Sequence, residues 1–146
     1  MSKKLSKQKL RHNARQAAMQ ALYQWQFNAP PIEELIQNVL NEKVSDQIDL
    51  EYFKLLVMGA VNTVTEIDAV ISPALDRDIK DLNPVELAIL RVSSYELLER
   101  PDVPYKVVIN EGVELAKIFG ADQSHKYINA VLDKLALKHR ETETKK

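Results

Sequence analysis

Apolar residues recur every three or four positions along most of this chain, which is the spacing of helices that bury one face. The chain has three glycines and few alternations of β-branched and polar residues, so strands are not indicated. Prolines and capping residues divide the pattern into about seven predicted helices, over residues 6–27, 32–42, 50–70, 74–79, 83–100 and 123–138 and between Pro104 and Gly120. Short connections between that many helices favour an all-α bundle.

The predicted helix over residues 83–100, NPVELAILRVSSYELLER, is apolar on nearly all sides and so differs from the others. Asn83 is placed to cap its first turn, Pro84 occupies the first helical position, and Glu86 has the spacing of a capping box. Pro101 ends the helix, because it disfavours helical geometry at the residue before it. A helix that is apolar all round has neighbours on several sides. We therefore expect it at the centre of the bundle.

Two further features concern packing and domain limits. Gly59 lies in the middle of the predicted helix over residues 50–70, where glycine lowers helix stability by roughly 1 kcal/mol, so it indicates close approach of another element. The last eight residues, HRETETKK, show no apolar periodicity and are expected to be disordered. We expect one domain over residues 1–138 and a disordered tail over residues 139–146.

Charge is distributed unevenly, although the formal net charge is only −1. Residues 1–32 hold six of the 20 basic residues and none of the 21 acidic ones, which leaves the rest of the chain 14 basic and 21 acidic residues, a balance of −7. Several of the six cations project onto the apolar stripe of the first helix, so that this face changes from apolar to cationic along its length. The six form a basic arm over residues 1–15: Lys3, Lys4, Lys7, Lys9, Arg11 and Arg15.

The basic arm has three interpretations. Its cations would attract a polyanion such as RNA, and exposed aromatic rings nearby would stack on unpaired bases. The arm could instead be a frayed, charged end that only keeps the chain in solution. An anionic membrane ranks third, because the apolar side of the helix is mostly alanine. Of the aromatic residues that follow, Trp25 lies on the apolar stripe and is expected in the core, whereas Tyr23 projects to the surface.

Little in the sequence indicates an enzyme. The absence of cysteine excludes disulfides and thiolate ligands and fits a reducing cytosol. No long uncharged apolar run indicates a membrane span or a secretory signal. The three histidines, His12, His125 and His139, show no metal-ligand spacing. We expect no catalytic residue, no cofactor, no metal, no membrane contact and a cytoplasmic location.

Charged residues within the predicted helices have structural interpretations. Glu111 and Glu114 are three residues apart, and we expect them to be solvated or paired with nearby lysines rather than to act as a general acid and base. Arg91 interrupts the apolar helix over residues 83–100. We expect it to pair with an acid, such as Glu96 or one on another helix, rather than to contact a ligand.

Two long motifs follow the basic arm: ARQAAMQALYQW over residues 14–25, and ELAILRVSSYELLERPDVPYKVVINEGVELAKIFGADQSHKYINAVLDKL over residues 86–135. Together with the arm they resemble the NusB family of bacterial transcription antitermination factors. The resemblance spans nearly the whole chain, is weakest over residues 29–49, and is most specific in VPYKVVINE and SHKYINAVLDK. It implies a single all-helical domain of two helical subbundles.

The resemblance also implies a function without catalysis. Members of the family would bind boxA, a short single-stranded element in the leaders of ribosomal RNA transcripts, jointly with the ribosomal protein NusE. The pair would nucleate a complex with RNA polymerase, NusA and NusG that lets transcription pass terminators. The alternative left open by the residues is a helical protein–protein adaptor without direct RNA binding, in which the acidic body docks a partner and the arm is only a tail.

Site residues are implied by position in the family motifs. Tyr23 matches a tyrosine implicated in RNA and partner binding, Glu86 matches an acidic residue near the NusE and RNA surfaces, and Tyr127 matches the aromatic position of an SHKF-type motif. The expected NusE contacts are Tyr23 and Glu86. The expected RNA contacts are Lys3, Lys4, Lys7, Lys9, Arg11, Arg15, Tyr23, Gln123, Lys126 and Tyr127. We expect the arm and the start of the last helix to form one surface.

The arm departs from the family pattern at two positions. Arg11 and Arg15 correspond to its arginine-rich arm, but His12 and Asn13 stand where some relatives have arginine. The lysines of the arm restore charge without the bidentate geometry of a guanidinium. Gln123 likewise replaces an acid that is often found at its position, a change that favours RNA by removing a negative charge.

Overall fold

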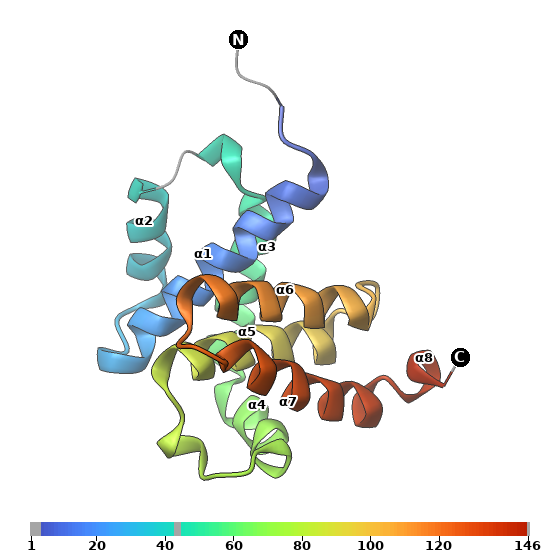
Figure 1. Cartoon of the computed structure of the whole chain (residues 1–146). Helices are drawn as coiled ribbons and strands as arrows, with labels where there is room; N and C mark the ends of the chain where they lie inside the picture. Colours follow the sequence, from blue (N-terminus) through green and yellow to red (C-terminus); the bar gives the residue numbers. More distant parts are fainter. Residues whose placement is uncertain (1–3, 43–44, 146) are drawn as a thin grey trace.

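The computed structural model describes residues 4–42 and 45–145, and every regular element in this part of the chain is helical (Figure 1). Lys3 of the predicted arm lies outside the described residues. The α-helices are α1 (Lys7–Asn28), α2 (Ile32–Glu42), α3 (Leu50–Asn62), α4 (Val64–Ile71), α5 (Pro84–Glu99), α6 (Tyr105–Phe119), α7 (Ser124–His139) and α8 (Glu141–Thr144). Three 3₁₀ turns join them: η1 (Ser45–Gln47), η2 (Ser72–Ala74) and η3 (Ile79–Asp81). The all-α prediction is confirmed.

Helix α5 is the centre of the bundle, as its all-round apolar pattern predicts. It packs against α1, α3, α4, α6 and α7. Its start follows the predicted cap, because Asn83 Oδ1 accepts a hydrogen bond from the backbone N–H of Val85 at 2.8 Å. Helices α1, α2 and α3 lie together on one side of α5, and α4, α6 and α7 pack on its other sides, which gives the expected two subbundles (Figure 1). Its buried apolar side chains are Ala88, Ile89, Leu90, Val92 and Leu97.

The single helix predicted over residues 50–70 is wrong, because the chain bends by 78° between α3 and α4. Thr63 lies at the break, with φ −118° and ψ 24°, outside helical geometry. Its Oγ1 donates to the carbonyl oxygen of Gly59 at 2.7 Å, and such bonds to the preceding turn bend helices. No single helix in the described part of the chain has the length and apolar composition of a membrane crossing, although the bent α3–α4 pair would meet both criteria taken together.

Two other segments differ from expectation. Residues 74–79 do not form a short helix, because Asp78 Oδ1 accepts from the N–H of Lys80 at 3.1 Å and starts η3 instead. Residues 139–145, expected to be disordered, are ordered: α7 extends to His139, Arg140 is only 7% exposed, and α8 follows. Arg140 contacts backbone far away in the sequence, which no local apolar pattern reveals.

Gly59 is a point of close approach between α3 and α5, as its place in the helix predicts. A methyl group built on its Cα would lie 2.1 Å from Cζ of Tyr95 on α5. Real Cβ atoms do not come this near to a neighbour, so the aromatic ring occupies the space that any other residue at position 59 would need. The loss of helix propensity at Gly59 is therefore offset by ring packing between two central helices.

We expect the Gly59→Ala variant to be destabilised by about 1–3 kcal/mol, because the added methyl group overpacks the contact with Tyr95. Without that contact the same change would stabilise the helix by about 1 kcal/mol, so the sign of the effect tests the packing. Urea unfolding measures the difference. Lys54→Ala, at an exposed position of the same helix, is the matched control and should stay within about 0.5 kcal/mol. A stabilised Gly59→Ala variant would contradict the contact.

Candidate nucleic-acid interface

Arg15, a predicted RNA contact, is instead buried where α1 crosses α5. Its exposed fraction is 5%, and that of its partner Glu96 is 1%. Arg15 Nε donates to the two carboxylate oxygens of Glu96 at 2.9 and 3.0 Å, and Nη2 donates to Oε2 at 2.7 Å. The hydroxyl of Tyr52 donates to the same Oε2, so one carboxylate joins α1, α3 and α5. This internal use of its guanidinium corrects the expectation that Arg15 grips RNA.

The same cluster shifts the titration of two of its members. Burial raises the pKa of Tyr52 far above its usual value, and the charge and hydrogen bond of Glu96 act in the same direction. Burial opposes the charge on Arg15, but the hydrogen bonds and charge of Glu96 outweigh it and raise the pKa of Arg15. Arg15 therefore stays cationic and Tyr52 stays protonated in the folded protein.

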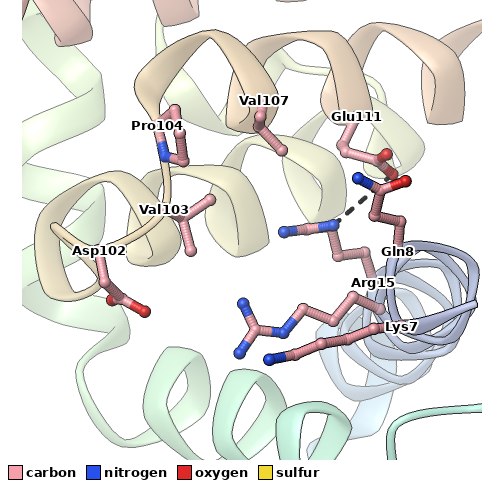
Figure 2. A pocket seen from close by; sticks show the side chains of 9 residues that line it. Lys7, Gln8, Arg15, Asp102, Val103, Pro104, Val107 and Glu111 are labelled. Atoms are coloured by element: carbon pink, nitrogen blue, oxygen red, sulfur yellow. Dashed lines mark ion pairs between the residues drawn. The ribbon is translucent and has the colours of Figure 1, made fainter.

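An open cavity of 450 Å³, which we call the arm cavity, lies between the start of α1 and the segment that leads into α6 (Figure 2). The α1 side supplies three cations, and the opposite wall supplies two acids. Nη1 of Arg15 lies 4.0 Å from Oε2 of Glu111, the ion pair drawn in Figure 2. The lining residues are Lys7, Gln8, Arg11, Arg15, Asp102, Val103, Pro104, Val107 and Glu111.

Of the two arginines in this wall, Arg11 is the one with N–H donors available to bind an anion. Its Cζ lies 4.1 Å from the centroid of the Tyr52 ring, and its Nε lies 3.8 Å from Oδ2 of Asp49. Arg11 makes no hydrogen bond with any residue that the structure describes. Stacking on a ring leaves the edge of a guanidinium available for bidentate hydrogen bonds. The exposed lysines of the arm are Lys4, Lys7 and Lys9.

His12 and Asn13, which replace arginines of some relatives, fasten α1 to the body of the protein. Nδ1 of His12 lies 2.7 Å from Oε2 of Glu111 on α6. Nδ2 of Asn13 donates to the carbonyl oxygen of Gln47 at 2.7 Å. Both contacts hold this turn of α1 in place, so the arm cavity has a firm wall on the α1 side.

Two ion pairs confirm the structural interpretation of other charged residues. Arg91 donates Nη2 and Nε to the carboxylate of Asp68 on α4, at 2.8 and 3.0 Å, so its partner is on another helix and is not Glu96. Lys117 Nζ lies 3.7 Å from Oε1 of Glu114. The first pair joins α5 to α4, and the second lies within α6.

A second cationic and aromatic group lies at the start of α7, and we call Arg77, Gln123, Lys126 and Tyr127 the α7 cluster. The guanidinium carbon of Arg77 lies 4.6 Å from the ring centroid of Tyr127. Burial raises the pKa of Tyr127, and the neighbouring Asp76 adds to the shift. Gln123 precedes the first residue of α7 with a left-handed backbone, φ 71°, and its side chain does not cap the helix. Gln123 and Lys126 are exposed.

The sequence alone did not indicate Arg77, because it lies between two acids in a segment where no motif places it over Tyr127. Its stacking depends on the path of the chain between η2 and η3, which the apolar pattern does not specify. Arg77 is also paired with Asp76, whose carboxylate accepts from its Nε at 2.8 Å and from its Nη2 at 3.3 Å, so Lys126 remains the exposed cation of this cluster that has no acidic partner among the described residues.

Tyr23 and Glu86 lie on either side of the contact between the end of α1 and the start of α5. Tyr23 is 37% exposed and meets Phe27 edge-on, with ring centroids 5.0 Å apart, so the prediction that it is available at the surface is confirmed. Trp25 packs against the core, as predicted. Glu86 is 9% exposed and accepts from Ser124 Oγ at 2.8 Å, so its carboxylate ties α5 to α7 instead of closing a capping box.

Tyr23 also borders an apolar hollow of 320 Å³. Its walls come from α1, from the first turn of α5 and from the last residue of α6. Such a half-open apolar surface beside an exposed ring suits either a base or a protein side chain. The lining residues are Met19, Gln20, Tyr23, Gln24, Val85 and Phe119.

The residues predicted to form one surface of arm and α7 lie in two patches along α6. The arm cavity borders the segment before α6 and the first half of this helix, through Pro104, Val107 and Glu111, whereas the α7 cluster lies at the start of α7, which follows the end of α6 (Figure 1). Helix α6 has 15 residues, which at 1.5 Å per residue corresponds to about 22 Å. Tyr23 lies nearer the second patch, because its hollow includes Phe119. Among the described residues, no group of three or more His, Asp or Glu could hold a metal ion.

We expect Glu96→Gln to lower folding stability by about 3–5 kcal/mol, since it leaves the buried Arg15 guanidinium without its counter-charge. Guanidinium chloride unfolding measures the loss. Glu114→Gln removes an acid from an exposed ion pair and is the control, with an expected effect below about 1 kcal/mol. Equal effects of the two changes would show that the buried pair contributes no more than a surface pair.

The raised pKa of Tyr52 predicts a loss of stability at alkaline pH. Unfolded Tyr52 releases its proton near pH 10 while folded Tyr52 retains it, so its contribution is complete below about pH 10 and is lost as the pH rises toward the raised pKa. The stability difference between the unchanged chain and Tyr52→Phe should shrink by up to about 1.4 kcal/mol per pH unit above that point. Urea unfolding at about pH 9, 10 and 11 tests this. Parallel curves for the two proteins would contradict it.

Comparison with known proteins places this arrangement among antitermination factors. The model of the NusB family matches residues 12–137. The chain is 50% identical to the transcription antitermination protein NusB of Pseudomonas savastanoi over 135 residues, which cover 92% of this chain and 82% of that one.

Two solved structures share the fold at 30% identity. One is NusB of T. maritima, with a TM-score of 0.79 over 88% of this chain and 91% of that one. The other is NusB in a complex of the antitermination factors NusB and NusE with double-stranded RNA, with a TM-score of 0.75 over 87% of this chain and 96% of that one. With the family model covering most of its length and a relative this similar, the chain belongs to the NusB family.

Proposed function

We propose that this chain is an RNA-binding antitermination factor that takes the single-stranded boxA element of ribosomal RNA leader transcripts together with the ribosomal protein NusE. The observation that carries the proposal is the arm cavity on a chain whose remaining body is acidic. In this cavity Arg11 makes no hydrogen bond with any described residue, and Lys7 lines the same wall. Cations gathered on one edge of an acidic protein orient a polyanion and speed its capture. A related protein solved with NusE and RNA supports the choice of partners.

In the arm cavity, a backbone phosphate would lie on the α1 side. Arg11 would supply two parallel N–H donors and Lys7 a mobile point charge. Asp102 and Glu111 on the opposite wall repel a phosphate, so they restrict it to the α1 side. Arg15 would act beneath this contact as a fixed positive charge, since its guanidinium is already bound to Glu96.

At the other end of α6, the ligand would be read by stacking rather than by charge alone. Tyr23 would offer a ring face to an unpaired base, Tyr127 would contribute the ring on which Arg77 stacks, and the exposed Lys126 would lie beside a phosphate. A strand that reaches both patches would have to follow α6, whose 15 residues span about 22 Å. An extended single strand meets this requirement, and no chemical step is needed.

NusE would dock beside the second patch and complete it. The hollow next to Tyr23 presents apolar walls from Val85 and Phe119, and Glu86 follows Val85 in α5 with one carboxylate oxygen held by Ser124. The joint surface would then recruit RNA polymerase, NusA and NusG in the cytoplasm. Base specificity would come from the pair, because the arm by itself recognises only charge.

Replacing both Lys7 and Arg11 by glutamine should weaken boxA RNA binding and flatten its salt dependence. If the native protein contacts about five phosphates, log K against log salt has a slope of roughly −3.5, and each lost contact reduces its size by about 0.7. A fluorescence-anisotropy titration at several salt concentrations, with and without NusE, measures both quantities. Lys54→Gln, an exposed lysine of α3 beside a different groove, is the matched control.

The same measurement separates RNA binding from the adaptor function. An adaptor that binds partners only through its acidic body would keep its NusE affinity and show no change of RNA affinity or salt slope in the Lys7→Gln, Arg11→Gln protein. That result would overturn the proposed role of the arm cavity.

A further inference from the structure

Arg140, directly after α7, is a buried cation that the RNA-binding surface does not use. It is 7% exposed, and its guanidinium donates to three backbone carbonyl oxygens. Nε donates to Leu97 at 2.8 Å, Nη2 to Arg100 at 2.8 Å and Nη1 to Val103 at 2.9 Å. Nη1 also donates to Oε1 of Glu143 at 2.7 Å.

These acceptors lie where α5 ends and the loop over residues 100–104 begins. The last four carbonyl groups of a helix lack partners within the helix and carry its negative dipole. A planar guanidinium with several fixed donors can satisfy carbonyls that point in different directions, whereas the single ammonium of lysine cannot. Arg140 therefore acts as a side-chain cap for α5, contributed from 43 residues away.

Glu143 makes the matching contact at the other end of the loop. Its Oε2 accepts a hydrogen bond from the backbone N–H of Tyr105, the first residue of α6, at 2.9 Å. A carboxylate is favoured at a helix start for the reason that a cation is favoured at a helix end. Arg140, which precedes α8, and Glu143 within α8 thus bring one residue of each charge to the two helix ends that the loop connects.

This loop is also the wall of the arm cavity opposite α1. Asp102, Val103 and Pro104 line the cavity (Figure 2). Val103 is also the residue whose carbonyl oxygen accepts a hydrogen bond from Arg140. Arg140 and Glu143 do not line the cavity, so their contacts with Val103 and Tyr105 fix the wall without occupying it. A loop that is already ordered in the free protein loses little conformational entropy when a ligand binds, so binding is stronger.

We propose that residues 140–144, which we call the latch, hold the loop over residues 100–104 in its shape, with Arg140 as a positioning residue for anion binding in the arm cavity. Only the binding half of this inference rests on the proposed RNA function. The loop-holding half is a property of the free protein.

The test uses the full chain with Arg140→Gln, and with Lys145→Gln as a control in the same segment, since Lys145 is exposed. Amide hydrogen exchange of Tyr105 should accelerate by roughly tenfold or more in Arg140→Gln, because the charged hydrogen bonds that fix α8 and Glu143 are lost. Exchange in the middle of α5 should stay unchanged, which a general loss of stability would not allow. Unchanged exchange at Tyr105 would overturn the latch.

RNA affinity is measured on the same proteins, using a boxA oligonucleotide. Arg140→Gln should weaken binding by about three- to tenfold, the effect of ordering one or two side chains on binding, with no change in salt slope. If exchange accelerates but affinity is unchanged while Lys7 and Arg11 variants bind weakly, the positioning role is overturned. If Lys7 and Arg11 variants bind normally, the RNA function itself fails and the loop-holding result still stands.

Arg140→Gln removes a buried charge, and its protein is checked for folding by circular dichroism. Should it fail to fold, Glu143→Gln serves in its place, because that side chain is 34% exposed and its loss leaves the buried Arg140 intact. The same outcomes are then expected of Glu143→Gln: faster exchange of the Tyr105 N–H, which donates to Glu143, and weaker RNA binding.

Discussion

A carboxylate that is 1% exposed cannot remain charged inside a helical core unless its oxygens are fully paired, and Glu96 meets this requirement through three helices. Arg15 approaches from α1 and Tyr52 from α3, each with a donor directed at the same group on α5. Because a guanidinium binds a carboxylate in one plane and at one distance, the network sets how α1 lies across α5. Apolar packing alone would tolerate small sliding of these helices.

The last turn of α5 is where two guanidinium groups from distant helices converge. Arg15 binds the Glu96 side chain on the α1 side, and Arg140 binds the carbonyl oxygens of Leu97 and Arg100 at the helix end. Both walls of the arm cavity depend on these contacts: the first holds α1, and the second holds the loop that faces it. The cations that face the cavity, Lys7 and Arg11, are therefore carried on a scaffold positioned by other, buried cations.

The position of α6 is central to the proposed RNA contact. Its first half borders the arm cavity and its end leads to the α7 cluster, so the two groups of candidate residues lie along one helix. In the proposed function, a flexible strand with phosphates at regular intervals would reach both groups and would present its bases where Tyr23 and Tyr127 lie.

Much of the architecture was predictable from spacing alone. The apolar repeat and the Asn83–Pro84 start predicted the helices and the central place of α5, and Gly59 correctly indicated a close contact. These are local properties, because helix formation and capping depend on residues a few positions apart. The break at Thr63 escaped prediction, since a hydroxyl bond to the preceding turn leaves the apolar repeat intact.

The sequence by itself determined that this is an all-α chain with a basic start, an acidic body and the motifs of its family. The roles of individual cations depend on contacts that only the folded chain creates. Arg15 is separated by 81 residues from its acid, and Arg140 by 43 from its first carbonyl, so neither pairing leaves a mark on local periodicity. Burial and pairing depend on which residues are neighbours in three dimensions. The sequence therefore could not decide which positively charged residues line a cavity, as Arg11 does, and which stabilise the core, as Arg15 does.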